Sequence, residues 1–339
     1  MSWSLHISLG LAACIVTYLA TGAVLRLLTA RAILDHANER SSHAGAVPRG
    51  GGIAVMAVII AAWCALAWLA PGKVGDSFNI TAIALLAAGL AGFSFLDDLS
   101  NLPTLQRLMM QLLAVALGCL VLPDSPVFQG LLPPVADRLA AGFCWLWFIN
   151  LFNFMDGIDG ITAVEAGSIG VGIALITQIS GAGGDLAALS AMAAGAVIGF
   201  GVLNWRPAKI FLGDVGSVGL GFLLGWLLLS LAAAGQWLPA LLLSLYYLCD
   251  ATWTLLRRIV RGEKFWQAHR SHFYQHAAQA CGDHGRIALL ILTCNLLLIA
   301  AALWAALGGN QWLALILGGA AVAFLLWYFA KMKPLDEME

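Results

Sequence analysis

The stretch Asn150-Leu-Phe-Asn-Phe-Met-Asp-Gly-Ile-Asp-Gly160 sets two carboxylates, Asp156 and Asp159, directly beside sequence of membrane-spanning character. Apolar residues run up to this stretch from Leu139 and resume at Ile161. An ionised side chain at such a position costs several kcal/mol unless a cation, a charged partner or water compensates it. The stretch therefore predicts a helical membrane protein with an acidic site at the mouth of its spans.

The composition supports this prediction over the whole chain. Hydrophobic residues make up 61% of the 339 residues and charged residues only 10%, against about 25% charged in soluble proteins. The mean hydropathy is +0.89. We expect an all-α, polytopic membrane bundle that forms one domain over residues 1–339, with a polar loop over 257–286, and no nucleic-acid partner.

Apolar runs of roughly 17 to 25 residues are long enough to cross a bilayer as helices. The sequence contains eleven such runs, so we expect about eleven transmembrane helices. They lie near residues 3–25, 51–70, 80–96, 108–122, 139–155, 161–180, 186–203, 215–234, 237–256, 287–307 and 311–330.

The basic residues orient these spans, because cytoplasmic loops are enriched in Lys and Arg. With the loops numbered in chain order, the odd loops and the C-terminal tail hold fourteen Lys and Arg residues, whereas the even loops hold only Lys73 and Arg138. We therefore expect a periplasmic N-terminus and a cytoplasmic C-terminus. The same parity places the acidic clusters and the late histidines on the cytoplasmic side of a bacterial inner membrane.

The pair Asp97-Asp98 closes the third expected span. Adjacent like charges near an apolar boundary repel each other, so one of them holds a proton unless a cation neutralises the pair. Oxygen ligands at the edge of a wet cleft suit Mg²⁺, which is commonly completed by substrate phosphates. Arg107, which follows soon after, is a candidate for pairing with phosphate oxygens.

The segment from Asn204 to Ser217 has the composition of a nucleotide-binding loop. Pro207 ends the preceding helix, and the glycines around Asp214 allow a ligand to approach the backbone closely. We expect the helix to resume after Ser217 and to offer free amides to an anion. Phe211 is a candidate for stacking on a base.

The loop over 257–286 carries His269, Arg270, His272 and His276. Spacings of three and four predict that the three histidines share one face of a helix. A zinc site is one interpretation, but the neighbouring arginines favour phosphate as the ligand. A polar surface helix without a ligand is the other interpretation.

Taken together, these motifs resemble the polyprenyl-phosphate N-acetylhexosamine-1-phosphate transferases, glycosyltransferase family 4. The resemblance covers nearly the whole chain. It rests on the order and spacing of Arg49-Gly-Gly-Gly52, Asp97-Asp98, Asn150-x-x-Asn153-x-x-Asp156-Gly-x-Asp159-Gly160, Phe211-x-Gly-Asp214-x-Gly-Ser217, and the His/Arg loop.

The resemblance implies a reaction and its cofactor. A UDP-N-acetylhexosamine would give its sugar 1-phosphate to undecaprenyl phosphate, with release of UMP. The resemblance also implies Mg²⁺ as cofactor, with Mn²⁺ as a substitute, and a homodimer as the oligomeric state. We favour direct in-line attack by the lipid phosphate, with a covalent phospho-sugar enzyme as the alternative.

The resemblance also implies roles for individual residues. Asp214 would be the firmest metal ligand, with Asp98 or Asp97 assisting or handling the acceptor phosphate; Asp97, Asp98 and Asp156 are the expected catalytic residues. The expected substrate-binding residues are Asn153, Asp159, Asn204, Phe211, Arg107, His269, Arg270 and His272.

Two departures from one branch of the family narrow the expected substrate. Phospho-MurNAc-pentapeptide transferases carry a lysine soon after the aspartate pair and consecutive histidines in the late loop. Here Asp98 is followed by Leu-Ser-Asn-Leu-Pro, and the late loop reads His269-Arg-Ser-His272. The sequence thus looks like the initiators of O-antigen or surface-polysaccharide synthesis, with the pentapeptide transferases as the alternative.

A secondary transporter or divalent-cation channel is the alternative from a different class of protein. Intramembrane carboxylates also bind coupling ions, but transporters place them near the midplane and often show paired repeats. Here the acidic residues lie at one edge of the spans, and the sequence shows no repeat. We therefore favour the enzyme.

Overall fold

The computed structural model describes residues 2–31, 47–70, 76–100, 102–182, 185–263 and 269–332. In these ranges the chain forms twelve α-helices, and its one named extended pairing is a single bridge between Arg49 and Phe211. The helices are α1 (Trp3–Ala30), α2 (Gly51–Leu69), α3 (Ser77–Ser100), α4 (Thr104–Cys119), α5 (Pro134–Phe154), α6 (Ile161–Ser180), α7 (Leu186–Asn204), α8 (Asp214–Ala233), α9 (Trp237–Val260), α10 (Phe273–Cys281), α11 (His284–Ala306) and α12 (Gln311–Lys331).

Ten helices of the described ranges are long and apolar enough to cross a membrane. The prediction of an all-α, multi-pass membrane protein is confirmed. The expected span near 108–122 corresponds to α4, whose sixteen residues rise about 24 Å, less than the roughly 30 Å of a bilayer core. Several charges that orient the predicted topology (Arg40, Lys73, Lys264 and Lys333) lie outside the described residues.

Helix α8 forms the centre of the bundle. In its most apolar window 94% of the residues are buried, against 17% in α1 and 28% in α12 at the periphery. Its glycines allow this packing: a side chain at Gly225 would lie 2.4 Å from the ring of Trp145 on α5. The indole N–H of Trp145 donates to the carbonyl of Phe222, so α5 and α8 are joined by a hydrogen bond as well as by close contact.

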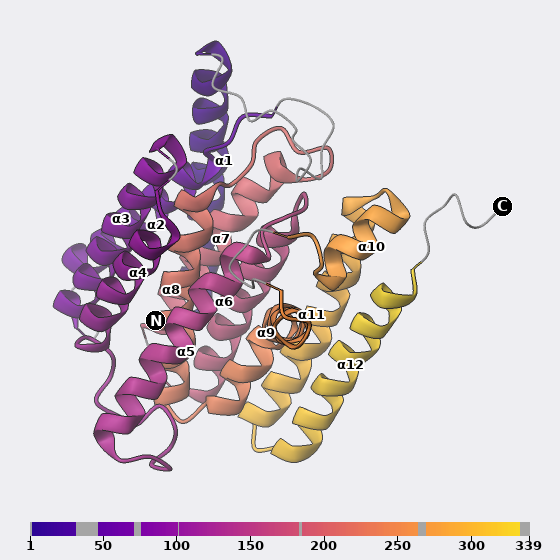
Figure 1. Cartoon of the computed structure of the whole chain (residues 1–339). Coiled ribbons are helices and arrows are strands. Elements are labelled where there is room, and N and C mark those ends of the chain that lie inside the picture. The colour runs from indigo at the N-terminus through magenta and orange to yellow at the C-terminus, as the bar shows by residue number, and fades with distance from the viewer. Residues whose placement is uncertain are drawn as a thin grey trace.

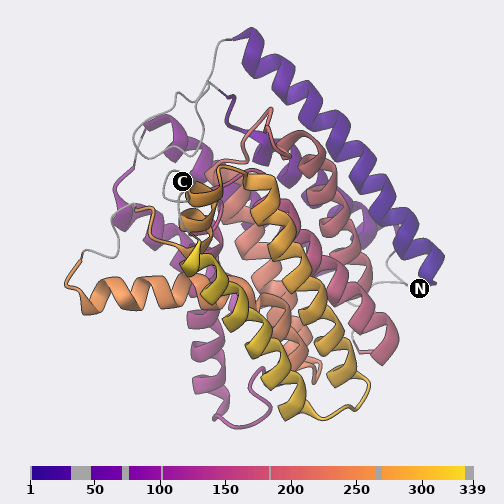
Figure 2. The same ribbon diagram turned by 90° about the vertical axis from the view of Figure 1, so that its right-hand side faces the viewer.

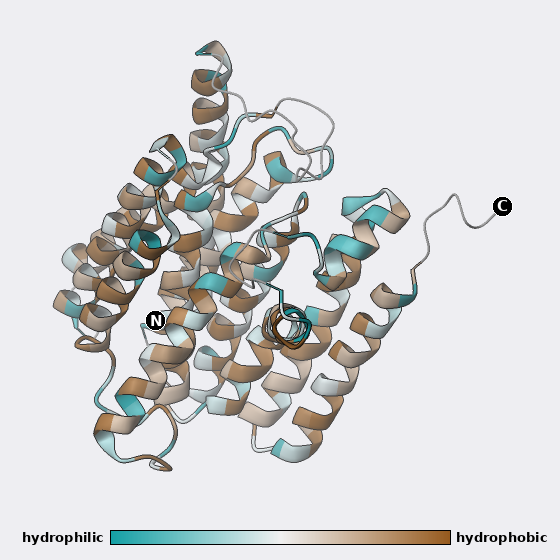
Figure 3. Ribbon diagram, viewed as in Figure 1, coloured by the Kyte–Doolittle hydropathy of each residue, from teal (hydrophilic) through white to brown (hydrophobic). Residues whose placement is uncertain are grey.

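The helices form one bundle with a single element that runs across it (Figure 1). The later part of α9 is seen nearly end-on in Figure 1 and lies across the picture in Figure 2, so it projects from the bundle transverse to its neighbours. Apolar residues cover the outer helices, and hydrophilic residues gather mainly at the end that holds α10 (Figure 3). That end contains the candidate site.

Candidate functional site

Arg49 lies at the centre of the acidic cluster. Its Nη2 atom is 2.5 Å from Oδ1 of Asp214 and 3.5 Å from Oδ1 of Asp98. Backbone pairing holds Arg49 in this place, because the amide of Phe211 donates to the carbonyl of Pro48 and the amide of Gly50 donates to the carbonyl of Phe211. These hydrogen bonds join the N-terminal end of α2 to the loop that precedes α8.

Asp214 is the first residue of α8, so the expected resumption of the helix after Ser217 is wrong by about one turn. Gly213 precedes it with φ of +78°, a left-handed conformation that glycine adopts without strain. A carboxylate in the first turn of a helix is stabilised by the helix dipole, which explains the earlier start. The Asp214 carboxylate therefore lies at the N-terminus of α8.

Asn153 connects the end of α5 to this cluster. Its Nδ2 atom donates to Oγ of Ser217 at 2.8 Å and lies 3.4 Å from Oδ1 of Asp214. One turn earlier, the amide of Asn150 donates to the side chain of Gln111 on α4 at 2.9 Å. Both asparagines thus point from α5 toward the acidic cleft, as their spacing of three predicts.

Asp97 and Asp98 face different partners although they are adjacent. Asp98 faces Arg49, whereas Asp97 is buried and lies 3.4 Å from the Nε atom of Arg107. The other oxygen of Asp97 accepts the amide of Leu102 at 2.8 Å. Asp97 therefore fixes the turn between α3 and α4 and holds Arg107 beside the cleft.

Asp156 and Thr162 bind each other between α5 and α6, the hydroxyl of Thr162 donating to Oδ1 of Asp156. Burial of Asp156 raises the pKa of its carboxyl to about 6, against the opposing hydrogen bond from Thr162 and the charge of Arg49. The charge of Asp214 acts in the same direction as burial. Asp156 therefore belongs electrostatically to the Arg49 cluster.

Asp159 has a different surrounding. It lies 3.3 Å from Nδ1 of His284 and 3.7 Å from Nη1 of Arg206, and it accepts the amide of Ala208 at 3.2 Å. Burial favours the protonated carboxyl, but these three partners outweigh it and hold the pKa of Asp159 below its ordinary value. The Asp159 carboxylate thus joins the α5–α6 turn to the α7–α8 loop and to α11.

Asn204, the last residue of α7, and Phe211, which precedes α8, are both held by contacts with the backbone. The side-chain amide of Asn204 is buried. Its oxygen accepts the N–H of Gly160, and its nitrogen donates to the carbonyl of Ile210, both at 2.9 Å. Phe211 is half-buried and forms the bridge with Arg49. These contacts fasten together the two loops in which the expected nucleotide-binding residues lie.

The prediction that three histidines share one helical face is wrong. Helix α10 begins only at Phe273, so His269 and His272 precede it and His276 alone lies within it. A capping box of His272 and Gln275 starts the helix, and Asp250, a buried residue of α9, accepts the amides of Phe273 and Tyr274 at 3.1 Å.

Asp250 also lies 3.3 Å from Nδ1 of His272, which is buried. His269 is partly exposed, and its ring stacks on that of His272 with 4.8 Å between ring centres. Arg270, partly exposed, lies between these two histidines in the chain. The hydroxyl of Tyr274 donates to the carbonyl of Phe154, so α10 is attached to the end of α5 near the acidic cluster.

The acidic cluster opens into a cleft of about 270 Å³. Its walls combine polar residues at one end with apolar ones along α3, α4 and α5. The polar residues are Ser94, Asp97, Thr104, Arg107, Gln111, Asn150, Asn153 and Asp214. A second, almost wholly apolar cavity of about 530 Å³ lies between α5, α8 and α9, and Trp147 lines both.

The carboxylates fit a divalent cation that is bound together with phosphate. No three His, Cys, Asp or Glu side chains in the described parts of the chain are arranged to hold a metal by themselves. Asp98 and Asp214 nevertheless reach a single cationic nitrogen, that of Arg49. Mg²⁺ commonly needs only one or two carboxylates, with substrate phosphates and water as its other ligands.

The sequence did not assign functional roles to several residues of this site. Arg49 was recognised only as part of a motif, and its glycine-rich context gave no sign that it would reach Asp214, 165 residues away in the chain. Asp250 and His284 lie in or beside apolar helices, where a buried charge is costly without a partner. That cost was the available signal, but the partner could be identified only from the fold.

Known proteins share this arrangement of sequence. The family model described as glycosyl transferase family 4 matches residues 80–232, a range that contains Asp97, Asp98, the Asn150–Gly160 stretch and Asp214. Decaprenyl-phosphate N-acetylglucosaminephosphotransferase of Mycolicibacterium smegmatis is 30% identical over 324 residues, which cover 83% of this chain and 77% of that protein.

Two further relatives differ in their named substrates. A probable undecaprenyl-phosphate N-acetylglucosaminyl 1-phosphate transferase of Bacillus subtilis is 27% identical over 284 residues, which cover 80% of this chain and 76% of the relative. A phospho-N-acetylmuramoyl-pentapeptide-transferase of Mycolicibacterium paratuberculosis is 32% identical over 256 residues, which cover 61% and 70% of the two chains.

Proposed function

Because this chain belongs to glycosyl transferase family 4, a transferase family, we propose that it moves an N-acetylhexosamine 1-phosphate from a UDP-sugar to undecaprenyl phosphate. The products are undecaprenyl-diphosphate-sugar and UMP. Two of the relatives reported above have a polyprenyl phosphate in their names, which supports the lipid acceptor. Their names give no support to the transporter alternative.

The observation that carries the proposal is the junction of a charged cluster with an apolar cleft. Asp214 lines this cleft and is joined through Arg49 to Asp98, and Arg107 lies along the same cleft. A reaction between a nucleotide diphosphate and a lipid phosphate needs such a junction, because one substrate is wholly polar and the other carries a long apolar tail.

The acceptor phosphate is proposed to bind at Arg107. The guanidinium of Arg107 is partly exposed and is held by Asp97, so it presents donors to a phosphate at little further entropic cost. The polyprenyl tail then follows the apolar cavity past Trp147, whose indole N–H is fixed by Thr252 of α9. Residues 237–248, in the earlier part of α9, contribute one wall of this cavity.

The donor is proposed to lie on the other side of the cluster, against Asn153, Asp156 and the Asp159 loop. Asp98 and Asp214 would hold a Mg²⁺ ion there, and that ion would neutralise charge on the diphosphate. His269, Arg270 and His272 are proposed to contact its phosphates or sugar. Because the acceptor is already an anion, we favour direct in-line attack, in which the protein mainly positions two anions.

The donor sugar is proposed to be N-acetylglucosamine or a similar simple amino sugar. The mycobacterial and Bacillus relatives named for N-acetylglucosamine align over more of this chain than the pentapeptide transferase does. The Leu-Ser-Asn-Leu-Pro sequence after Asp98 points the same way. We further propose a role in initiating O-antigen or surface polysaccharide, at a site that faces the cytoplasm of a bacterial inner membrane.

Release of UMP by the purified protein tests this proposal. The protein in detergent is given undecaprenyl phosphate, Mg²⁺ and, in turn, UDP-GlcNAc, other UDP-amino sugars and UDP-MurNAc-pentapeptide. We expect UMP only with lipid, metal and a simple amino sugar. Turnover of the pentapeptide donor alone would place the chain in the other branch, for which the 32% identical relative is the supporting observation.

A variant separates the acceptor site from the donor site. Arg107→Gln should raise the KM for undecaprenyl phosphate by roughly tenfold or more while the KM for the UDP-sugar stays unchanged, because a charge-assisted contact to one substrate is lost. Arg257→Gln, which removes an exposed arginine from the last turn of α9, serves as the control. An equal rise of both KM values would contradict the proposed acceptor site.

A further inference from the structure

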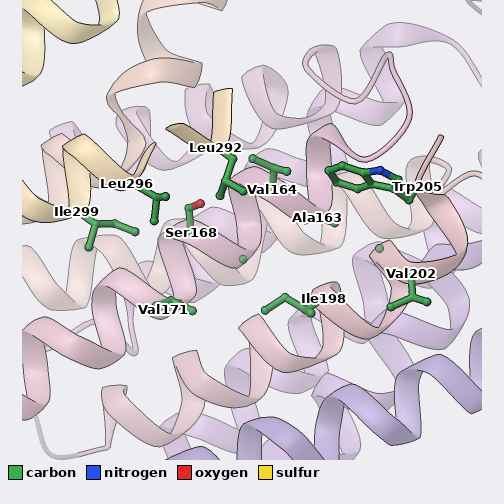
Figure 4. A pocket seen from close by; sticks show the side chains of 12 residues that line it. Ala163, Val164, Ser168, Val171, Ile198, Val202, Trp205, Leu292, Leu296 and Ile299 are labelled. Carbon is green, nitrogen blue, oxygen red and sulfur yellow. The ribbon is translucent and has the colours of Figure 1, made fainter. Parts of the chain in front are cut away.

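Outside the acidic cleft, residues of α6, α7 and α11 line an open apolar groove of about 520 Å³. Figure 4 shows side chains of all three helices turned toward it, among them Ile198 and Leu296, with Trp205 at one end. Ser168 and Trp205 contribute the only polar side-chain atoms among its lining residues, and none of these residues lines the acidic cleft. The groove is therefore a separate feature.

A polar hollow of about 600 Å³ begins where the apolar groove ends, and Trp205 lines both. Two exposed arginines, Arg206 and Arg286, lie in this hollow. Its one carboxylate is that of Asp283, which accepts the amide of Arg286 at 3.2 Å and so caps α11. The hollow therefore presents two guanidinium groups at the end of the apolar groove.

The apolar groove and the polar hollow together form one composite groove, because Trp205 lines both. The length of this composite groove matches one leaflet of a bilayer. Arg286 and Ile299 mark its two ends on α11, and the thirteen helical steps from one to the other rise about 20 Å. Half of a bilayer with its headgroups measures about 20 to 22 Å. With Ile299 near the midplane, the arginines stand at headgroup depth, and Trp205 lies at the interface that tryptophan prefers.

We propose that this composite groove binds one phospholipid with an anionic headgroup. An acyl chain lies between α6, α7 and α11, and the lipid phosphate is bound by Arg206 and Arg286, whose planar guanidinium groups suit phosphate oxygens. A free phosphate shares the headgroup chemistry but leaves the apolar groove unfilled. The continuity of apolar and basic lining is what selects a lipid.

The bound headgroup would contact Arg206, which also pairs with Asp159. Arg206 lies 3.7 Å from Oδ2 of Asp159 and donates to the carbonyl of Gly282 at 3.3 Å. A lipid phosphate on Arg206 would compete with the Asp159 carboxylate for the same guanidinium. The binding site is nevertheless defined by its own residues and does not depend on the proposed transferase reaction.

Lipid titrations followed by native mass spectrometry test the proposal. The full-length protein, delipidated in detergent, is titrated with phosphatidylglycerol and with phosphatidylcholine of the same acyl chains. We expect phosphatidylglycerol to bind about tenfold more tightly, because both lipids offer the phosphate but the two arginines repel the choline cation of phosphatidylcholine. Arg286→Gln should remove this preference, and Ile198→Trp, which fills the groove, should weaken binding of both lipids.

Matched variants elsewhere on the surface provide the controls. Arg26→Gln removes an exposed arginine from α1, and Ile316→Trp enlarges an exposed apolar side chain on α12; both should leave lipid binding unchanged. Elution profile and melting temperature report folding. If Ile198→Trp does not fold, Val171→Phe fills the same groove from α6.

Three results would overturn the proposal. The first is equal binding of the two lipids by the unaltered protein. The second is displacement of phosphatidylglycerol by millimolar inorganic phosphate, which would reduce the site to a simple phosphate site. The third is a dimer that Ile198→Trp or Val171→Phe converts to a monomer with unchanged lipid binding, because a second copy of the chain would then cover the groove.

Discussion

At the scale of single residues, the site is built on the sharing of one arginine by two carboxylates. Arg49 contacts Asp98 and Asp214 at once and so supplies one of the positive charges that the acidic motifs need. The need for a cation could be predicted from Asp97-Asp98. The identity of this cation could not, because Arg49 reaches the cluster only through backbone pairing with Phe211.

The variant Asp214→Asn should lower UMP release at least about 100-fold, as is usual when a charged group that stabilises a transition state is removed. The protein should still fold, because asparagine can accept the hydrogen bond from Arg49. The control is Asp124→Asn, which removes a fully exposed carboxylate from the α4–α5 loop. A comparable loss of activity in both variants would contradict the role of Asp214.

The raised pKa of Asp156 predicts that the free energy of unfolding depends on pH. Its folded-state pKa, raised from 3.8 to about 6, means that the ionised carboxylate disfavours folding, increasingly as pH rises above 3.8 and fully above about 6. Asp156→Asn keeps an acceptor for Thr162 without the charge. In the presence of EDTA it should therefore be more stable than the unaltered protein at pH 7.5, by roughly 2 to 3 kcal/mol.

At pH 5 the stability advantage of Asp156→Asn should shrink to roughly half, because the Asp156 carboxyl of the folded, unaltered protein is then mostly protonated. Melting temperatures of both proteins at the two pH values measure the effect. An advantage that is equal at both pH values, or a less stable Asp156→Asn at pH 7.5, would show that burial does not control this carboxyl.

At the scale of helices, the apolar runs predicted the elements well, and polar contacts decided where several of them begin. The expected run 215–234 is α8 at Asp214–Ala233, because a long apolar run in lipid must form all its hydrogen bonds within the helix. The start of α10 was predicted wrongly because a capping box of His272 and Gln275 and the carboxylate of Asp250 on another helix fix it together. The spacing of the histidines carries no information about the partner on α9.

Asp250→Ala should therefore loosen α10. The buried amide of Tyr274 and the part-buried amide of Phe273 lose their acceptor, and an unsatisfied buried group costs about 1 to 3 kcal/mol. Hydrogen exchange at α10 should accelerate, and UMP release should fall because His272 loses its partner. Asp283→Ala, which removes the exposed cap of α11, should change exchange only at α11. Unchanged exchange at α10 would contradict this account.

At the scale of the whole molecule, the sequence predicted an all-α membrane bundle and the clustering of its acidic motifs, but not the transverse course of α9. Hydropathy gives the length of a helix and not its direction, so residues 237–256 were expected to span like the others. The direction matters for function, because the later part of α9 carries Asp250, which contacts His272, and Thr252, which accepts the indole N–H of Trp147.

The central claim is that a sugar 1-phosphate, and not the sugar alone, passes to a lipid. The most direct test gives the purified protein UDP-GlcNAc labelled at its β-phosphorus, with undecaprenyl phosphate and Mg²⁺, and separates lipid from nucleotide by solvent extraction. We predict that the label moves to the lipid phase as UMP appears, and that EDTA or Asp214→Asn abolishes this transfer. Label that stays in the aqueous phase as UDP while sugar reaches the lipid would contradict the account.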